Sequence, residues 1–487
     1  MLLEGLMNVL SPDNLLFAFI GCLMGTLVGV LPGLGPVSAV AMLFPLTTYL
    51  PPEGMIISLA AIYYGAMYGG STTAILMNIP GEVASVPTAL DGFMLTKKGR
   101  AGPALSMAAI VSFIAGIFGT IVLCIVGPPL ARFCLNFGPP EYLSLAIFSL
   151  SAIASLSGRS MIKGFIMAVI GMLMGTMGID VLSSVPRFSY GSPVLMNGLD
   201  IAPVMIGLFG ISEVLRGMEE GSPGIYQGKI GKLMPNKEDF KVALPAGGRA
   251  TLLGTVLGII PGMLVSIVTF IAYSFEKRQS KHPERFGKGA IEGVAAAEAA
   301  NNAAAMAGFI PLLSLGIPTS GTMALILAAM MVFGVIPGPT MFTEHASFTW
   351  TIIGSFFIAN IILLVLNLPL VGLWAKLANI PYNIMAPIII SVCVAGAYSG
   401  RNTMFDVWIC IFFGAVGWIL SKIDWPVAPL VLGYILGDLL ETALRQVYFM
   451  GFNVLTDRPI FYFFIVLAVI SMYLSRHVTI AGDVEEN

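Results

Sequence analysis

The sequence predicts an all-α polytopic membrane protein with roughly 10–14 transmembrane or re-entrant helices, arranged in two homologous repeats. Hydrophobic residues make up 57% of the chain and charged residues only 10%, whereas a soluble domain carries about a quarter charged residues. Many apolar stretches approach ~20 residues, the length that spans a bilayer as a helix. A β-barrel is excluded because barrel strands alternate apolar and polar residues over short segments.

Apolar stretches of two kinds follow one another along the chain. We expect regular spans at 55–77, 103–126, 142–157, 161–179, 201–215, 345–369, 384–398, 404–421, 427–444 and 459–475. Three further apolar regions, 15–50, 250–275 and 289–336, contain Gly and Pro in their interiors. Proline lacks the N–H that a helix interior needs and glycine is a weak helix former, so these regions are predicted to be broken helices.

A ten-residue motif occurs twice and indicates an internal duplication. Residues 25–34 read GTLVGVLPGL, and residues 254–263 read GTVLGIIPGM. Shorter matches follow in the same order: Ser157-Gly158-Arg159 with Ser399-Gly400-Arg401, Ala202-Pro203 with Ala428-Pro429, and Glu213 and Arg216 with Glu441 and Arg445. We therefore predict four parts: membrane repeat 1 (1–216), a polar inter-repeat linker (217–248), membrane repeat 2 (249–475) and a polar C-terminal tail (476–487).

The charged connections bear on the orientation of the repeats. Basic residues gather in 97–100, 217–248 and 276–288, and basic loops favour the cytoplasm. If the last two loops are both cytoplasmic, 250–275 must enter the membrane and return, with its bend at Pro261-Gly262. Otherwise one loop overrides the rule. The repeats are inverted if each holds an odd number of crossings, and we favour this arrangement over a parallel one.

Broken helices supply the first candidate binding groups. Irregular backbone inside a membrane occurs where it is buried in protein or lines a watery cavity. A half-helix N-terminus then offers free N–H groups to a carboxylate, and a half-helix C-terminus offers carbonyls to a cation. We expect Gly33, Leu34, Gly35 and Pro36 to bind substrate and Gly262 to lie near a coupling ion. A kink that only shapes packing is the alternative.

Two polar clusters supply the remaining candidates. One lies 39 residues beyond Gly33 and the other 39 beyond Gly262, and the Gly-Ile-Pro of 316–318 echoes the Asn-Ile-Pro of 78–80 after an insertion of nine residues. Hydroxyls and amides hydrogen-bond carboxylates, and their oxygens ligate Na⁺. The substrate-binding candidates are Ser71, Thr72, Asn78, Asn301, Asn302, Pro318, Thr319, Ser320 and Gly321, and the coupling-ion candidates are Thr73 and Glu298. Hydrogen bonding between helices is the structural alternative for the neutral residues, and a place at the membrane edge beside Glu292 is the alternative for Glu298.

Other classes of function find little support in the sequence. The three histidines, 282, 345 and 477, are isolated, and the five cysteines form no CxxC pair. There is no G-x-x-x-x-G-K-[ST], H-E-x-x-H or G-x-S-x-G signature. We therefore expect no enzyme activity, no cofactor, no metal beyond a possible coupling Na⁺ and no nucleic-acid partner. An ion channel built on the same broken helices remains an alternative.

Several motifs resemble one family of transporters. They are Pro32-Gly33-Leu34-Gly35-Pro36, residues 64–71 (YGAMYGGS), Glu298-Ala299-Ala300-Asn301-Asn302 and Gly316-Ile317-Pro318-Thr319-Ser320-Gly321. Together they are similar to the large permease subunit of the bacterial tripartite tricarboxylate transporters, from about residue 15 to residue 475.

The resemblance implies a permease of the bacterial inner membrane that works with a small membrane subunit and a periplasmic solute-binding protein. It implies import of tricarboxylates or other citrate-like carboxylates, driven by a Na⁺ or proton gradient and without an ATPase subunit. A stand-alone carboxylate symporter is the nearest alternative, and an ion channel is more remote.

Overall fold

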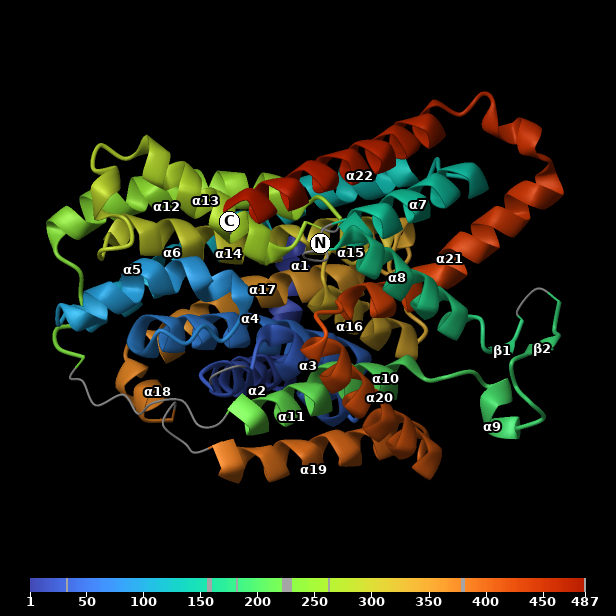
Figure 1. Ribbon diagram of the computed structural model, residues 1–487, viewed down its shortest axis with the longest axis horizontal. Helices are drawn as coiled ribbons and strands as arrows, with labels where there is room; N and C mark the ends of the chain where they lie inside the picture. Colours follow the sequence, from blue (N-terminus) through green and yellow to red (C-terminus); the bar gives the residue numbers. More distant parts are fainter. Residues whose placement is uncertain are drawn as a thin grey trace.

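A computed structural model describes residues 1–31, 34–155, 160–180, 183–220, 230–261, 263–377 and 382–485. The described residues are predominantly helical, with a single two-stranded hairpin among them (Figure 1), which confirms the all-α prediction. The first half contains α1 (Leu2–Val9), α2 (Pro12–Gly29), α3 (Pro36–Thr47), α4 (Pro52–Met77), η1 (Val83–Ser85), α5 (Val86–Lys97), α6 (Ala101–Cys134), α7 (Pro139–Ser155), α8 (Met161–Gly175), β1 (Gly178–Ile179), β2 (Pro186–Arg187), α9 (Pro193–Met196), α10 (Ile201–Met205), η2 (Ile206–Ile211) and α11 (Ser212–Glu220). The second half contains α12 (Lys237–Gly258), α13 (Val265–Gln279), η3 (Pro283–Arg285), α14 (Ile291–Ala307), α15 (Phe309–Leu315), α16 (Gly321–Val332), η4 (Pro339–Phe342), α17 (Ala346–Asn367), α18 (Val371–Leu377), α19 (Tyr382–Arg401), α20 (Met404–Lys422), α21 (Ala428–Met450), η5 (Phe452–Leu455) and α22 (Pro459–Glu485).

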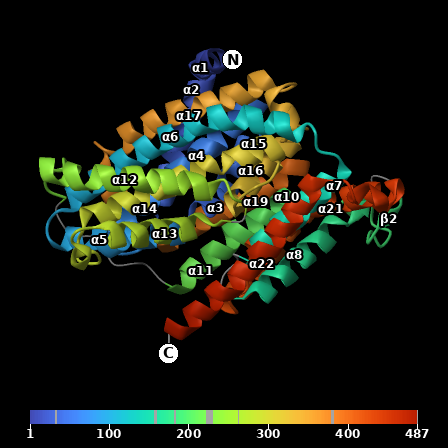
Figure 2. The ribbon, with the colours of Figure 1, turned by 90° about the horizontal axis from the view of Figure 1, so that it is seen from above.

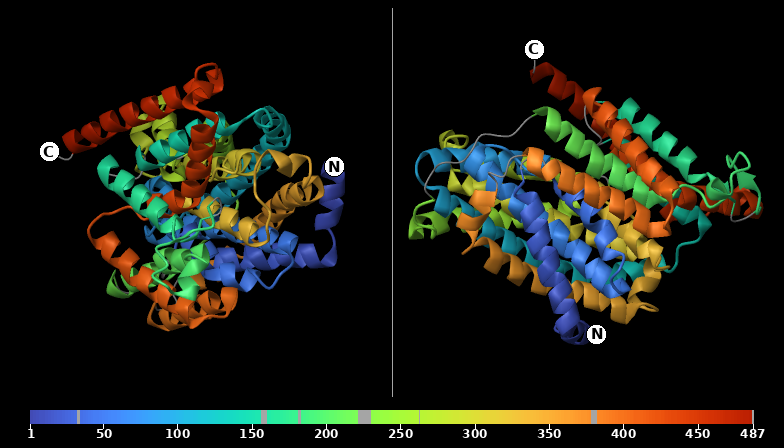
Figure 3. Two further views of the ribbon diagram at one scale, coloured as in Figure 1. Left: turned by 90° about the vertical axis from the view of Figure 1, so that its right-hand side faces the viewer. Right: turned by 90° about the horizontal axis from the view of Figure 1, so that it is seen from below.

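The chain is a multi-pass membrane protein. Six helices among the described residues are long and apolar enough to cross a bilayer: 12–29, 101–134, 201–219, 346–367, 384–401 and 404–422. Large apolar side chains such as Ile125, Phe165 and Trp408 are 59–66% exposed on the outside of the bundle, where lipid would cover them. Figure 3 shows α1 and the end of α22 on opposite sides of the molecule.

The helix breaks fall where glycine and proline predicted them. The region 15–50 is divided into α2 and α3, and 250–275 into α12 and α13. The region 289–336 is divided into α14, α15 and α16, with its main break at 316–320. Gly33 and Gly262 themselves lie outside the described residues. The polar stretches are more helical than expected, because α12 begins at Lys237, inside the predicted linker, and α22 continues through the predicted tail to Glu485.

Small residues allow two pairs of helices to pack at very short range. A Cβ placed on Gly25 or Gly29 of α2 would lie 2.2–2.3 Å from a backbone carbonyl oxygen of α4. A Cβ on Gly254 or Gly258 of α12 would similarly come within 2.5–2.7 Å of the α14 backbone. In both pairs the two residue numbers rise together, so the helices of each pair run parallel. This is the close approach that small residues permit in membranes.

The same contacts suggest a different alignment for the two predicted repeats. Gly25 meets Ile62, 37 residues further on, whereas Gly254 meets Ala300, 46 residues further on. On the predicted duplication, the difference, 46 − 37 = 9, would place the nine-residue insertion before α14 instead of after it. Asn301 would then correspond to Tyr63, and not to the Ser-Thr cluster as the constant spacing of 39 residues suggested.

Helices α4 and α14 cross in opposite directions. Tyr64 of α4 contacts the sulfur of Met306, and Ser71 contacts Glu298, so one residue number rises as the other falls. Since α2 runs parallel to α4 and α12 runs parallel to α14, the unit α2–α4 and the unit α12–α14 point in opposite directions. Inverted repeats require this relationship, although the duplication of the whole chain stays a prediction.

The chain segment 250–275 enters the bundle and returns. At one end, Arg100 pairs with Asp239 at the start of α12, and the Lys98 ammonium donates to the carbonyl of Lys288, beyond the end of α13. Both basic connections therefore lie at the same end, with α5 (Figures 1 and 2), while the β1–β2 hairpin lies at the opposite end. The structure therefore agrees with the alternative in which 250–275 enters and returns. In this arrangement both basic loops can lie on the same side of the membrane, as the positive-inside rule favours.

Candidate functional site

The centre of the molecule is the alanine-rich helix α14. Every residue from Ile291 to Ala307 is buried, with α4, α5, α6, α12 and α13 packed around it. Alanine is a strong helix former with a short side chain, so it lets several helices approach one axis closely. Because α14 is buried, its polar side chains are not exposed to solvent. They must therefore form hydrogen bonds with the surrounding helices.

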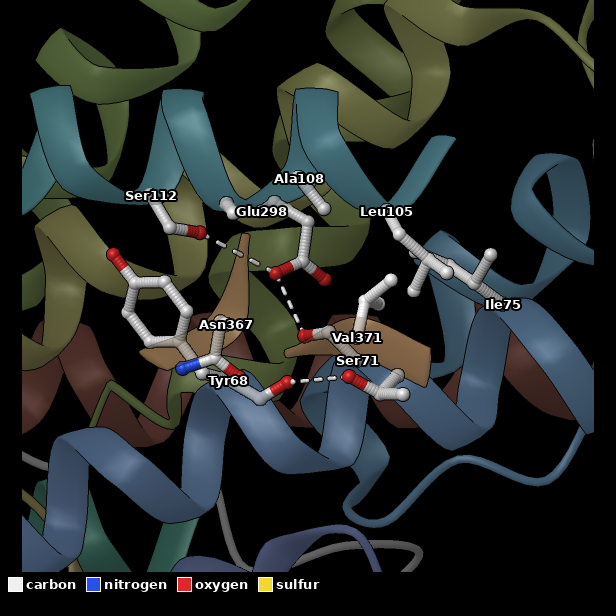
Figure 4. A pocket seen from close by; sticks show the side chains of 11 residues that line it. Tyr68, Ser71, Ile75, Leu105, Ala108, Ser112, Glu298, Asn367 and Val371 are labelled. Carbon is white, nitrogen blue, oxygen red and sulfur yellow. Dashed lines mark hydrogen bonds between the residues drawn. The ribbon is translucent and has the colours of Figure 1, made fainter. Parts of the chain in front are cut away.

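Glu298 lies inside this bundle and not at a membrane edge. Its side chain is 1% exposed. One carboxylate oxygen accepts a hydrogen bond of 2.6 Å from the Thr88 hydroxyl of α5, and the other accepts from Ser71 of α4 at 2.7 Å and Ser112 of α6 at 3.5 Å. Figure 4 shows the carboxylate between Ser112 and Ser71. In the part of the chain that the structure describes, no basic side chain forms an ion pair with Glu298. A buried carboxylate without a cationic partner is costly and marks a functional position by default.

A small cavity opens beside the Glu298 carboxylate. Its volume is about 20 Å³, which is room for a single water molecule or a bare monovalent cation and far too little for a tricarboxylate. Oxygen-bearing side chains line much of its wall: Tyr68, Ser71, Thr72, Ser112, Glu298 and Asn367. Two of these oxygens, the Tyr68 hydroxyl and the amide oxygen of Asn367, are buried without a hydrogen-bond partner. The wall can therefore offer further ligands to a cation held at Glu298.

The two adjacent asparagines of α14 face different partners, as the ~100° between neighbouring helix positions requires. Asn302 donates at 2.7 Å to the Ser112 hydroxyl, so it belongs to the Glu298 cluster. Asn301 donates at 3.3 Å to the carboxylate of Glu82 in the break after α4, and its own amide oxygen is buried without a partner. The asparagines thus connect Glu298 to a second acid, Glu82.

The predicted substrate groups at the breaks gather at two helix N-termini. Gly35 is the N-cap of α3, with Pro36 in its first turn, and Ser320 is the N-cap of α16. A Cβ on Gly321 would lie 3.7 Å from the Val37 side chain, so these two N-termini are neighbours. Leu34, just before the α3 N-cap, is 1% exposed.

Several of the other predicted residues cap helices or form hydrogen bonds within their own helix. The Ser320 hydroxyl accepts from the backbone N–H of Met323 and caps α16. Asn78 ends α4 in the left-handed conformation, at φ 59°. Thr73 donates to the carbonyl of Gly70 within its own helix, and Thr72 likewise donates to the carbonyl of Tyr68. Pro318 follows the αL cap of α15 at Gly316, and a Cβ on Gly308 would lie 2.6 Å from the Thr319 hydroxyl.

The comparison with known proteins decides the family. The chain matches the tripartite tricarboxylate transporter TctA family over residues 15–432. The chain belongs to this family. It is also 45% identical over 443 residues to an "uncharacterized 52.8 kDa protein in TAR-I ttuC' 3'region" of Agrobacterium vitis, covering 91% of this chain and 88% of the relative. A second protein of that organism, "uncharacterized protein in TAR-II ttuC' 3'region", is 48% identical over 193 residues, covering 40% of this chain and 80% of the relative. No solved structure matches the chain.

Sequence reasoning missed several residues at the centre of this member of the TctA family. Thr88 and Ser112 donate to Glu298, and Asn367 and Tyr68 line its cavity. Thr88, Ser112 and Asn367 are scattered among other polar residues of their helices, so no local pattern distinguishes them. Tyr68 lies in the 64–71 motif, but its position there does not indicate a contact with the Glu298 cavity. Glu82 carried a usable signal, since an acid directly after a Gly/Pro break is as unusual as Glu298 in its alanine-rich helix.

Proposed function

We propose that this TctA-family protein is the permease subunit that carries tricarboxylates and similar, citrate-like carboxylates inward across the bacterial inner membrane. It works with a small membrane subunit and a periplasmic solute-binding protein, and a Na⁺ or proton gradient drives it. One combination of features carries the proposal. Two helix N-termini, those of α3 and α16, meet at breaks in the apolar bundle, and Glu298 of α14 is a buried acid with no ion-pair partner among the described residues.

The two N-termini supply the anion-binding part of the mechanism. The first turn of a helix has N–H groups without intrahelical acceptors, and the helix dipole adds a positive potential there. A substrate with several carboxylates can use both N-termini at once, one carboxylate for each. Neutral groups of this kind bind an anion without holding it as tightly as a buried arginine would, which favours release on the far side.

Glu298 and its cavity supply the coupling part. The cavity is too small for the substrate and has room only for a water molecule, which can deliver a proton, or for a bare cation. A cation at Glu298 neutralises the buried carboxylate and offsets the charge that the substrate brings into a low-dielectric bundle. Substrate and cation therefore favour one another's binding, which is the thermodynamic requirement for symport.

Uptake into proteoliposomes tests this proposal. Vesicles holding the chain and its small partner are supplied with labelled citrate and other carboxylates, with and without the solute-binding protein and with an imposed Na⁺ or proton gradient. Accumulation that needs both the binding protein and a gradient is the expected result. Gradient-driven accumulation without the binding protein would make the chain a stand-alone symporter. Rapid ion flux with no carboxylate accumulation would favour the channel alternative.

A further inference from the structure

Glu82 has no role in the transport mechanism proposed above, although it lies close to the proposed substrate site. It lies in the break between α4 and α5, where the backbone has left the helix at Asn78. The loop is pinned there because Gly81 packs on Gly70 of α4, where an added Cβ would lie 2.6 Å from the Gly70 Cα. The side chain of Glu82 is partly exposed, whereas its partner Asn301 is 1% exposed.

The immediate surroundings of Glu82 leave acceptor atoms without donors. Its carboxylate accepts one hydrogen bond, at 3.3 Å, from the Asn301 amide. The amide oxygen of Asn301 is buried and has no hydrogen-bond partner. Among the described residues no basic side chain forms an ion pair with Glu82. The Asn301 amide oxygen and the neighbouring Glu82 carboxylate can together act as ligands of a cation. Burying the amide oxygen without a hydrogen-bond donor is costly.

A second acid makes this cost larger. Asn301 follows Glu298 by three positions on α14, which is about 4.5 Å along the helix axis. Glu82, in the loop after α4, therefore bonds to α14 about one turn from Glu298. Two neighbouring acids oppose each other's ionisation unless cations lie beside them.

Glu82 also lies at the proposed substrate position. Its Cβ is 3.4 Å from where a Cβ would stand on Gly35, the N-cap of α3. An ionised Glu82 without a counter-ion would repel a substrate carboxylate approaching that N-terminus. A cation on Glu82 would turn this repulsion into attraction.

We propose that Glu82 and Asn301 form a Na⁺ site separate from the Glu298 cavity, so that the carrier binds two Na⁺ ions and the one at Glu82 must be present before the substrate carboxylate. The ligands would be the Glu82 carboxylate, the Asn301 amide oxygen and carbonyl groups of the break. One carboxylate with neutral oxygens matches the charge of a monovalent ion, and unwound backbone carbonyls are common Na⁺ ligands in transporters. The order of binding rests on the proposed carboxylate transport, but the site itself does not.

Direct Na⁺ binding tests the site without any substrate. The purified full chain in detergent is titrated with radioactive Na⁺, and folding of each variant is checked by size-exclusion chromatography and thermal unfolding. We expect two equivalents for the wild type, one for the isosteric variant Glu82→Gln, and two for the control Glu284→Gln, whose acid is exposed in the loop after α13. Asn301→Ala, which leaves the Glu82 carboxylate in place, is expected to weaken one of the two equivalents at least tenfold.

The possible results separate this inference from the proposed function. Two unaltered equivalents in Glu82→Gln or, if that variant does not fold, in Asn301→Ala would overturn the site. A wild type that binds one equivalent or none would overturn it too, and thermal stabilisation by low pH that disappears in Glu82→Gln would then make Glu82 a proton carrier. Failure of the wild type to accumulate carboxylates would overturn the proposed function and leave a measured Na⁺ site intact.

Discussion

The Ser71 hydroxyl of α4 donates a 2.7 Å hydrogen bond to the Glu298 carboxylate of α14, across 227 positions of sequence. The bond joins the two antiparallel helices at the centre of the bundle, and Tyr64 and Met306 make a second contact between them. Any movement of α4 relative to α14 must stretch or break the Ser71–Glu298 bond. The protonation or cation occupancy of one carboxylate is thereby tied to the relative position of two structural units.

Removing the charge of Glu298 is expected to uncouple transport. Glu298→Gln keeps the size of the side chain but offers the cavity a neutral amide in place of a carboxylate. We expect the cation concentration for half-maximal carboxylate uptake to rise by at least ~10-fold, since a charge-assisted contact of ~1.5–3 kcal/mol is lost. Uptake measured against Na⁺ concentration and against pH checks this, with exposed Glu284→Gln as the matched control. An unchanged cation dependence in Glu298→Gln would remove Glu298 from the coupling mechanism.

The three hydroxyls around Glu298 are expected to differ in importance. Ser71 and Thr88 donate at 2.7 and 2.6 Å, whereas Ser112 stands at 3.5 Å and receives a bond from Asn302. Ser71→Ala and Thr88→Ala should each weaken cation binding about tenfold, because a hydrogen bond to a charged group contributes ~1.5–3 kcal/mol. Ser112→Ala should have the smaller effect on cation affinity. The three variants are compared in one cation titration of uptake, and a ranking with Ser112→Ala most severe would contradict this account.

The sequence could predict those parts of the site that depend on local chemistry, and not those that depend on how the helices pack. The breaks before Pro36 and after Gly316 were predictable because the chemistry of proline and glycine acts locally. Glu298 was predictable because an acid inside an alanine-rich apolar helix is conspicuous. The partners of Glu298 were not predictable, since Thr88 and Ser112 reach it only through the way in which three helices cross.

The alignment of the two halves shows a second limit. The equal spacing of 39 residues from Gly33 and Gly262 suggested that the Ser-Thr cluster of α4 corresponds to the asparagines of α14. If the halves are repeats, the packing of Gly25 on Ile62 and of Gly254 on Ala300 moves that correspondence by nine residues. A spacing in sequence cannot show on which side of a helix an insertion lies, whereas backbone contacts between glycine and its neighbour can.

Close helix packing predicts opposite effects for two glycines of α12. A Cβ on Gly258 would lie 2.5 Å from the Ala304 Cα, whereas a Cβ on Gly248 meets nothing within 4 Å. Gly258→Ala should destabilise the protein by ~1–3 kcal/mol through overpacking. Gly248→Ala should be neutral or stabilising by up to ~1 kcal/mol, because alanine is the better helix former. Thermal unfolding of the two variants in detergent checks this, and equal midpoints would show that α12 and α14 are not in this close contact.

Asp91 is expected to hold the start of α14 in place. Its side chain is completely buried, and one carboxylate oxygen accepts from the backbone N–H groups of Gly289 and Ala290 at 2.7 and 2.8 Å. The other accepts from the Tyr273 hydroxyl at 2.8 Å. Asp91 is one turn after Thr88 on α5, so the residue that fixes the start of α14 also fixes the helix that presents Thr88 to Glu298.

Asp91→Asn and Tyr273→Phe separate these contributions. The asparagine retains only one acceptor oxygen for three donors, so at least one buried donor loses its partner, at a cost of ~1–3 kcal/mol. Tyr273→Phe removes a donor and leaves both backbone bonds of Asp91 in place, so its cost should be smaller. We expect Asp91→Asn to lower the unfolding midpoint and, because Thr88 is displaced, to weaken cation binding as Thr88→Ala does. A lower midpoint with unchanged cation affinity would show that the start of α14 and the Glu298 site are mechanically independent.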